Sequence, residues 1–163
     1  MSQPFVRSLF SGLVLPAAGL VSTFALAAPA YAASTIEVSK SATGHVTIFG
    51  TQASDSVDIN GGGSTINVSS ILNSVTAGTG CVQLGATVRC SGVGSVGVHT
   101  LSGDDSVRNS TNLRSFLDGG VGNDRLTGGS EHDNIQGGAG NDFANGAGGI
   151  DTCNAETESS CEQ

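Results

Sequence analysis

The sequence predicts an all-β protein, and two observations lead to that prediction. The first is a series of short runs in which β-branched and apolar residues alternate with polar ones, which is the pattern of half-buried strands. These runs are Thr35 to Val38, His45 to Phe49, Ser56 to Ile59, Thr65 to Val68 and Val96 to Leu101. The second is a glycine-rich nine-residue repeat in the C-terminal part. No long helical pattern appears after residue 32.

Length and composition limit how this fold is stabilised. A chain of 163 residues suggests one domain, or one domain with an appendage. It has 25 glycines, no tryptophan and one tyrosine, so the side chains that fill a wide core are scarce. Ordering so much glycine costs backbone entropy. A bound metal or disulfides would help to offset that cost.

The charge of the chain favours cations as partners. Six basic residues stand against 14 acidic ones, for a net charge of −8, and most of the acids follow Gly103. This sign disfavours nucleic acid and anionic membrane surfaces as partners.

The N-terminal 32 residues have the pattern of a secretory signal peptide. Arg7 supplies the positive start, an apolar run follows from Leu9 to Leu26, and Ala30-Tyr31-Ala32 is an A-x-A cleavage signature. A membrane anchor is the alternative, but two glycines and a proline interrupt the run and no basic cluster follows it. We therefore expect cleavage after Ala32, a secreted, extracellular protein and no membrane insertion of the mature chain. Cleavage removes Arg7 and no acid, which takes the net charge from −8 to −9.

The four cysteines are expected to form two disulfides, because export permits them. Three pairings are possible. We favour Cys81–Cys90 and Cys153–Cys161, because each pair closes a short loop, and the first pair flanks an apparent hairpin that turns near Gly85. A zinc site is the alternative, but the CxxC spacing that such sites use is absent.

Four consecutive blocks of nine residues run from Gly119 to Asn154. Each has glycine at its first position, aspartate at its sixth and a small or apolar residue at its eighth. Glycines let the first six residues turn tightly, so that backbone carbonyls converge near the aspartate. Calcium prefers six to eight such oxygens at about 2.3–2.6 Å. One turn cannot supply them all, so the repeat predicts calcium ions held between turns.

These blocks resemble the RTX, or repeats-in-toxin, family, whose repeat G-G-x-G-x-D-x-U-x binds calcium. The resemblance implies a right-handed parallel β-roll, a β-solenoid in which one coil uses two blocks. Turns 18 residues apart then stack with an ion between them, which pairs Asp124 with Asp142 and Asp133 with Asp151. Inward side chains would be Leu126, Ile135, Ala144 and Cys153, with Cys153–Cys161 as a cap. The resemblance implies carbonyl ligands from the repeat glycines, namely Gly119, Gly120, Gly122, Gly128, Gly129, Gly137, Gly138, Gly140, Gly146 and Gly148.

A partial block precedes the four complete ones. Asp105 lies nineteen residues before Asp124, so one inserted residue near Asn109 would stack their turns and add a third calcium site to the two above. The stretch from Ser110 to Asp118 has Ser115 at the aspartate position, so we expect a coil there without a full metal site.

The nine-residue phase continues faintly upstream, at Asp55 and Val57, at Ser64 and Ile66, and at Asn73 and Val75. We expect degenerate coils at these three places. The division is then a signal peptide at 1–32, an irregular β-rich N-terminal part at 33–99, a calcium-binding β-roll at 100–154 and a disulfide cap at 155–163. Whether residues 33–99 join the solenoid or form a separate β-domain stays open.

No catalytic motif is recognisable. The chain lacks both the H-E-x-x-H zinc helix and the G-x-S-x-G nucleophile elbow, and His45, His99 and His132 have ordinary surface interpretations. The first hypothesis is therefore a non-catalytic, secreted calcium-binding module with a structural or interaction role that folds on binding. The alternative is a small secreted hydrolase whose active site lies in the N-terminal part, with the roll as a folding aid.

Overall fold

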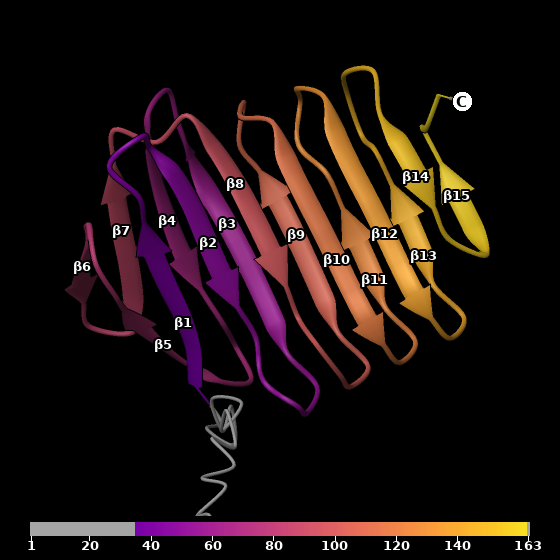
Figure 1. Ribbon diagram of the computed structural model, residues 1–163, viewed down its shortest axis with the longest axis horizontal. Coiled ribbons are helices and arrows are strands. Elements are labelled where there is room, and N and C mark those ends of the chain that lie inside the picture. Colours follow the sequence, from indigo (N-terminus) through magenta and orange to yellow (C-terminus); the bar gives the residue numbers. More distant parts are fainter. Residues whose placement is uncertain (1–34, 163) are drawn as a thin grey trace, which may run out of the picture.

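The computed structural model of the protein describes residues 35–162, which form an all-β solenoid of two stacked sheets (Figure 1). The predicted all-β fold and β-roll are confirmed. The expected signal peptide at 1–32 lies outside the described residues. Among residues 35–162 there is no helix long and apolar enough to cross a membrane.

Sheet A has seven strands and sheet B has eight. In spatial order, sheet A contains β14 (Thr152–Asn154), β12 (Asp133–Ala139), β10 (Ser115–Val121), β8 (Ser95–His99), β2 (His45–Phe49), β1 (Thr35–Lys40) and β5 (Ser74–Ala77). Sheet B contains β15 (Thr157–Ser159), β13 (Phe143–Asn145), β11 (Arg125–Thr127), β9 (Ser106–Ser110), β3 (Ser56–Gly62), β4 (Thr65–Ser69), β7 (Thr87–Ser91) and β6 (Cys81–Leu84).

From β8 onward the chain alternates between the sheets, and each strand pairs in parallel with the strand two further on. Leu117 pairs with Ile135, so one coil takes eighteen residues. Val98 pairs with Leu117, which makes the preceding coil one residue longer. Val107 likewise pairs with Leu126, nineteen residues on. The predicted insertion is therefore confirmed, and it lies between Val107 and Leu117, a range that contains Asn109.

Residues 45–60 form the first coil of the same solenoid. Strand β2 pairs in parallel with β8 and β3 with β9, each at an offset of fifty residues. Asp55 and Val57 therefore lie in a coil, as predicted. Residues 33–99 do not form a separate domain where the structure describes them, because both sheets continue through them.

The predictions of coils at the other two upstream places, around Ile66 and around Val75, are wrong. After β3 the chain reverses at Gly63, where φ is +59°, so Ile66 lies on the antiparallel strand β4. Strands β7 and β6 add to β4 in antiparallel fashion. Val75 lies on β5, which pairs with β1 at the far end of sheet A. A nine-residue phase cannot distinguish a coil from a hairpin, because both bring every second side chain inward.

One apolar core lies between the sheets, and it becomes thinner toward the C-terminus. Before residue 100, the buried apolar side chains come from every strand except β6. After residue 100, each half-coil contributes one, in the order Val107, Leu117, Leu126, Ile135 and Ala144. The predicted inward positions of the repeats are confirmed, with Cys153 only partly buried.

Both disulfides are present in the pairing that the sequence favours. Cys81 and Cys90 are direct partners on β6 and β7, whose hairpin turns at Gly85 with φ of +63°. Cys153 on β14 is bonded to Cys161, which fastens the end of the chain to the last coil.

Candidate metal centre

Aspartates at the ends of the turns stack in two columns, one along each long edge of the solenoid. The first column contains Asp55, Asp105, Asp124 and Asp142, each of which comes just before a strand of sheet B. The second contains Asp133 and Asp151, which lie beside sheet A. All six are buried, with at most 4 % of their surface exposed. The structure thus brings together Asp124 with Asp142, Asp133 with Asp151, and Asp105 with Asp124, the three pairs predicted from the sequence.

Hydrogen bonds along each column join one coil to the next. In the first column the backbone N–H of Asp124 donates to Oδ1 of Asp142 at 2.8 Å, and that of Asp105 to Oδ1 of Asp124 at 2.9 Å. The N–H of Asp55 donates in the same way to Asp105 at 2.7 Å. In the second column the N–H of Asp133 donates to Asp151 at 2.8 Å. One carboxylate oxygen of Asp105, Asp124, Asp142 and Asp151 therefore accepts a hydrogen bond from the coil before it.

Two glutamates end the columns at the C-terminal side. The N–H of Asp142 donates to Oε2 of Glu156 at 2.9 Å, and that of Asp151 to Oε2 of Glu162 at 2.7 Å. The first bond holds the pKa of Glu156 below its usual value. Sequence reasoning missed both residues, because they lie fourteen and eleven residues beyond their partners and so outside the eighteen-residue period.

The second carboxylate oxygen of most column members has no partner. Oδ2 of Asp105, Asp124, Asp142 and Asp151 is buried and accepts no hydrogen bond from the described residues. Burial raises the pKa of the Asp105 carboxyl to about 6, and it also raises the pKa of Asp124 and Asp151. Buried polar atoms without partners are rare in proteins and call for an explanation. A cation would supply the missing partner to a hard, charged oxygen of this kind.

Three successive turns of the first column share one backbone conformation. The second and fourth residues of turns 100–105, 119–124 and 137–142 have positive φ, between +77° and +153°. The turns approach so closely that a Cβ added at Gly122 would collide with the carbonyl of Gly103, and one at Gly140 with that of Gly122. A Cβ added at Gly119 would meet both Oδ2 of Asp124 and the carbonyl oxygen of Gly137, so a carbonyl of the next turn lies near a partnerless aspartate oxygen. Among residues 35–162 no cluster of three His, Cys, Asp or Glu side chains suited to a metal is found, and the predicted ligand set is instead mostly carbonyls.

The second column is less regular. Turn 146–151 has positive φ at Ala147 and Gly149, as in the first column, but turn 128–133 has no residue with positive φ. Glu131 occupies its fourth position, where a side chain disfavours that conformation. Here the N–H of Gly129 donates to Oδ2 of Asp133 at 2.6 Å, and Ser115 donates twice to Oδ1. The Asp133 carboxylate is therefore satisfied by the protein, whereas Oδ2 of Asp151 is not.

Gly148, one of the predicted carbonyl ligands, differs from Gly122 and Gly140. It is the third residue of its block rather than the fourth, and its φ is not in the positive range. Gly149 takes the fourth position, with φ of +123°. The other predicted glycines occupy the first two or the fourth positions of the turns, although Gly128 and Gly129 belong to the irregular turn.

Asp55 ends the first column on the N-terminal side and differs from the rest. Its Oδ2 accepts a hydrogen bond from the N–H of Thr51 at 2.6 Å, and its Oδ1 accepts one from the Thr51 hydroxyl at 3.1 Å. The turn that contains Asp55 therefore satisfies its own carboxylate. No buried oxygen of Asp55 is left for a cation.

Two histidines make contacts that resemble parts of a catalytic relay. His45 Nδ1 lies 2.8 Å from Ser95 Oγ, and His99 Nδ1 lies 3.3 Å from Asp118 Oδ2. The two contacts involve different histidines, at opposite ends of the paired strands β2 and β8. They do not combine into one Ser-His-Asp arrangement, whose recognition rests on geometry. His132 Nδ1 instead contacts the carbonyl of Ile150 at 2.9 Å.

The stacked strands define the class of this protein as a β-roll, and its turns carry buried aspartate oxygens without a partner. Residues 118–153 match the family model of the RTX calcium-binding nonapeptide repeat, in four copies, so the resemblance seen in the sequence is confirmed for this segment. The match supports a calcium-binding role. No curated protein and no solved structure matches the chain. Asp105 and its turn lie outside the matched segment.

Proposed function

We propose that the protein is a secreted calcium-binding module that folds when ions bind between its turns, with a structural or interaction role rather than a catalytic one. The observation that carries the proposal is the set of four buried aspartate oxygens without a partner, on Asp105, Asp124, Asp142 and Asp151. Each belongs to a turn whose second and fourth residues have positive φ. The family match supports calcium as the ion.

The first column supports two ion positions, between the turns of Asp105 and Asp124 and between those of Asp124 and Asp142. In both places, two successive turns share the same conformation and carry a partnerless oxygen. The second column supports one position, between the turns of Asp133 and Asp151. Only one of those two turns has the regular conformation, so we expect this site to be weaker.

Folding and binding are coupled through charge. When calcium is bound, it supplies positive charge and accepts oxygen ligands from both turns. Without it, carboxylates of one column repel each other across adjacent coils, and burial disfavours the charged forms of Asp105 and Asp124, whose pKa values it raises. Calcium binds only the folded coil and therefore shifts the folding equilibrium toward it. The thin core of the roll offers little apolar burial to oppose unfolding in the absence of the ion.

Two observations support export, which is part of this proposal. The N-terminal 32 residues have the sequence pattern of a signal peptide, and the chain has two disulfides, which are typical of oxidising compartments. Calcium outside cells is abundant enough for weak sites of the extracellular class. The roll would therefore complete its folding after export.

The test is circular dichroism of the mature chain titrated with calcium. We expect β-structure to increase with calcium and not with magnesium, because magnesium requires stricter octahedral geometry and loses water reluctantly. Asp142→Ala should shift the calcium midpoint about tenfold or more upward, because it removes a partnerless oxygen and the Oδ1 acceptor of Asp124. Asp58→Ala is the matched control, since Asp58 lies on the outer face of β3, away from both columns, and its midpoint should stay unchanged.

Two outcomes would contradict the proposal. An identical β spectrum in excess chelator and in calcium would rule out coupled folding. Equal effects of the two substitutions would show that the columns are not the calcium sites.

A further inference from the structure

We propose that a groove on the outer face of sheet B binds an acidic glycan, and that Arg108 receives its anionic group. This proposal concerns a surface that calcium does not use, so it goes beyond the function proposed above.

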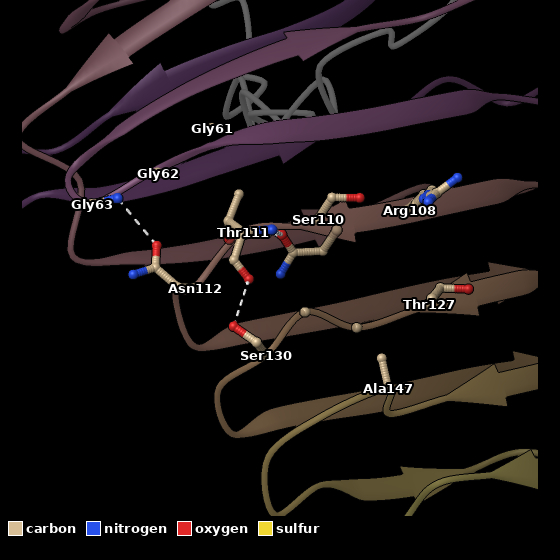
Figure 2. Close-up of a pocket in the computed structure, with 13 residues that line it drawn as sticks. Gly61, Gly62, Gly63, Arg108, Ser110, Thr111, Asn112, Thr127, Ser130 and Ala147 are labelled. Carbon is tan, nitrogen blue, oxygen red and sulfur yellow. Dashed lines mark hydrogen bonds between the residues drawn. The ribbon is translucent and has the colours of Figure 1, made fainter.

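The groove consists of two adjoining hollows of about 480 and 390 Å³. Arg108 and Thr127 line both of them. Figure 2 shows the larger hollow, with Arg108 and Ser110 on β9 between Thr127 on one side and the glycines Gly61–Gly63 on the other. The smaller hollow continues across Arg125 on β11 to Asn145 on β13.

The larger hollow exists because the chain reverses after β3. After β9, β11 and β13, the chain crosses from sheet B to sheet A, and the turns stack closely. At Gly62 and Gly63 it forms a hairpin instead, and a Cβ added at either glycine would meet no atom within 4 Å. The hairpin therefore forms a wall without side chains, joined to the next turn by a hydrogen bond from the Gly63 N–H to Asn112 Oδ1 at 3.1 Å (Figure 2).

Positive charge is concentrated in this groove although the protein is acidic. Arg108 pairs in register with Thr127 and Arg125 with Ser106, so the two arginines are diagonal neighbours on one face, about 7–8 Å apart between Cα atoms. Both are exposed, and neither makes a salt bridge with the described residues. Asp58 lies opposite Arg108 on β3, but its carboxylate accepts a hydrogen bond from Asn60 at 3.1 Å and forms no ion pair with the arginine.

The chemistry of the lining favours a glycan over an acidic peptide. Thr127 lines both hollows, Ser110 lines the larger one, and Ser106 and Asn145 line the smaller one. Their hydroxyl and amide groups can donate to or accept from sugar hydroxyls. The groove lies on a sheet face, so it offers no free strand edge for a peptide backbone.

Arginine suits the anionic part of such a ligand. A guanidinium group binds a carboxylate or sulfate in bidentate fashion. That of Arg125 lies 4.3 Å from the centre of the Phe143 ring, which holds it in place beside the groove.

The test measures glycan binding by the calcium-loaded protein, with isothermal titration calorimetry and a chondroitin sulfate hexasaccharide as the probe. We expect Arg108→Gln to weaken binding about tenfold or more and Arg108→Lys to restore part of it. Arg89→Gln is the matched control, because Arg89 lies on the same sheet outside both hollows, where its Nε donates to Asn67 at 2.9 Å. This control should bind like the unchanged protein. A neutral chitin hexasaccharide should bind at least tenfold more weakly.

Several results would overturn the proposal. These are no binding by the unchanged protein, equal losses from the Arg108 and Arg89 substitutions, or binding of hexaglutamate as tight as that of the glycan. Full competition by inorganic sulfate at equal concentration would indicate a simple anion site instead. If Arg108→Gln fails to fold, modification of the unchanged protein with phenylglyoxal decides the question, since the glycan should protect Arg108 and not Arg89.

Discussion

At the scale of single residues, each column aspartate uses its two oxygens differently. In Asp105, Asp124, Asp142 and Asp151, Oδ1 accepts a backbone hydrogen bond from the coil before it, while Oδ2 has no partner. The sixth position of the repeat predicts where the carboxylates lie. It does not predict this division, because the Oδ1 partner is an N–H eighteen or more residues away.

The raised pKa of Asp105 predicts that calcium binding weakens as the pH falls. In the calcium-free fold burial raises this pKa to about 6, above the ordinary value of 3.8, so the folded state binds more protons than the unfolded state between these values. The calcium-free fold therefore loses stability as pH rises through 6. Where the turn of Asp105 is folded without calcium, the ion must displace this proton, and at pH 5 the carboxyl of the folded turn is about nine-tenths protonated, so affinity at its site should fall about tenfold from pH 7.

Calorimetric calcium titrations at pH 7, 6 and 5 would measure this effect. Asp105→Asn removes the titrating group and should make the affinity of the remaining sites less dependent on pH. Unchanged affinity of the original protein between pH 7 and 5 would contradict the prediction.

At the scale of elements, the turn is the unit that carries function. The sequence predicted the strand positions of the repeats, because the alternation of inward and outward residues is local. Glu131, which stands where the repeat has glycine, marks turn 128–133 as irregular already in the sequence, but the sequence did not predict that Ser115 bonds to Asp133 across a coil. It also did not reveal the glutamates that end the columns, because the last half-coils are shorter than a full repeat.

Two glycine substitutions test whether the protein needs glycine only where φ is positive and the turns stack closely. At Gly122, φ is +144° and a Cβ would collide with the carbonyl of Gly103, so Gly122→Ala should destabilise the calcium-loaded protein by about 1–3 kcal/mol. At Gly148 the nearest atom to a Cβ would be 3.7 Å away, so Gly148→Ala should be neutral or stabilising by up to about 1 kcal/mol. Chemical denaturation in saturating calcium measures both changes. If both variants lost the same amount of stability, close stacking of the turns would not be the reason that Gly122 must be glycine.

At the scale of the whole molecule, stability is distributed unevenly along the solenoid. The part before residue 100 has most of the buried apolar side chains and the Cys81–Cys90 disulfide. Its one column member, Asp55, is satisfied by Thr51 within its own turn. The roll after residue 100 has one buried apolar side chain per half-coil and all the partnerless carboxylate oxygens. The N-terminal part therefore needs calcium least.

Hydrogen exchange in excess chelator should reveal this difference. We expect the backbone amides of β2, β3 and β4 to stay protected, because their side chains form the thick part of the core. Amides of β11 and β13 should exchange at least a hundredfold faster than in calcium, since their coils lose the ions that offset carboxylate repulsion. Uniform loss of protection along the chain would show instead that the solenoid folds as one calcium-dependent unit.

The sequence by itself determined the class of this protein, the register of its repeats and the positions of the column aspartates. These features are local or periodic, so residue types at fixed spacing are enough to specify them. Only the tertiary structure decided which aspartate oxygens lack a partner and that residues 60–94 form a hairpin cap instead of coils. The physical reason is that each of these depends on atoms from different coils meeting, and the parallel stacking that brings them together has no local signal in the chain.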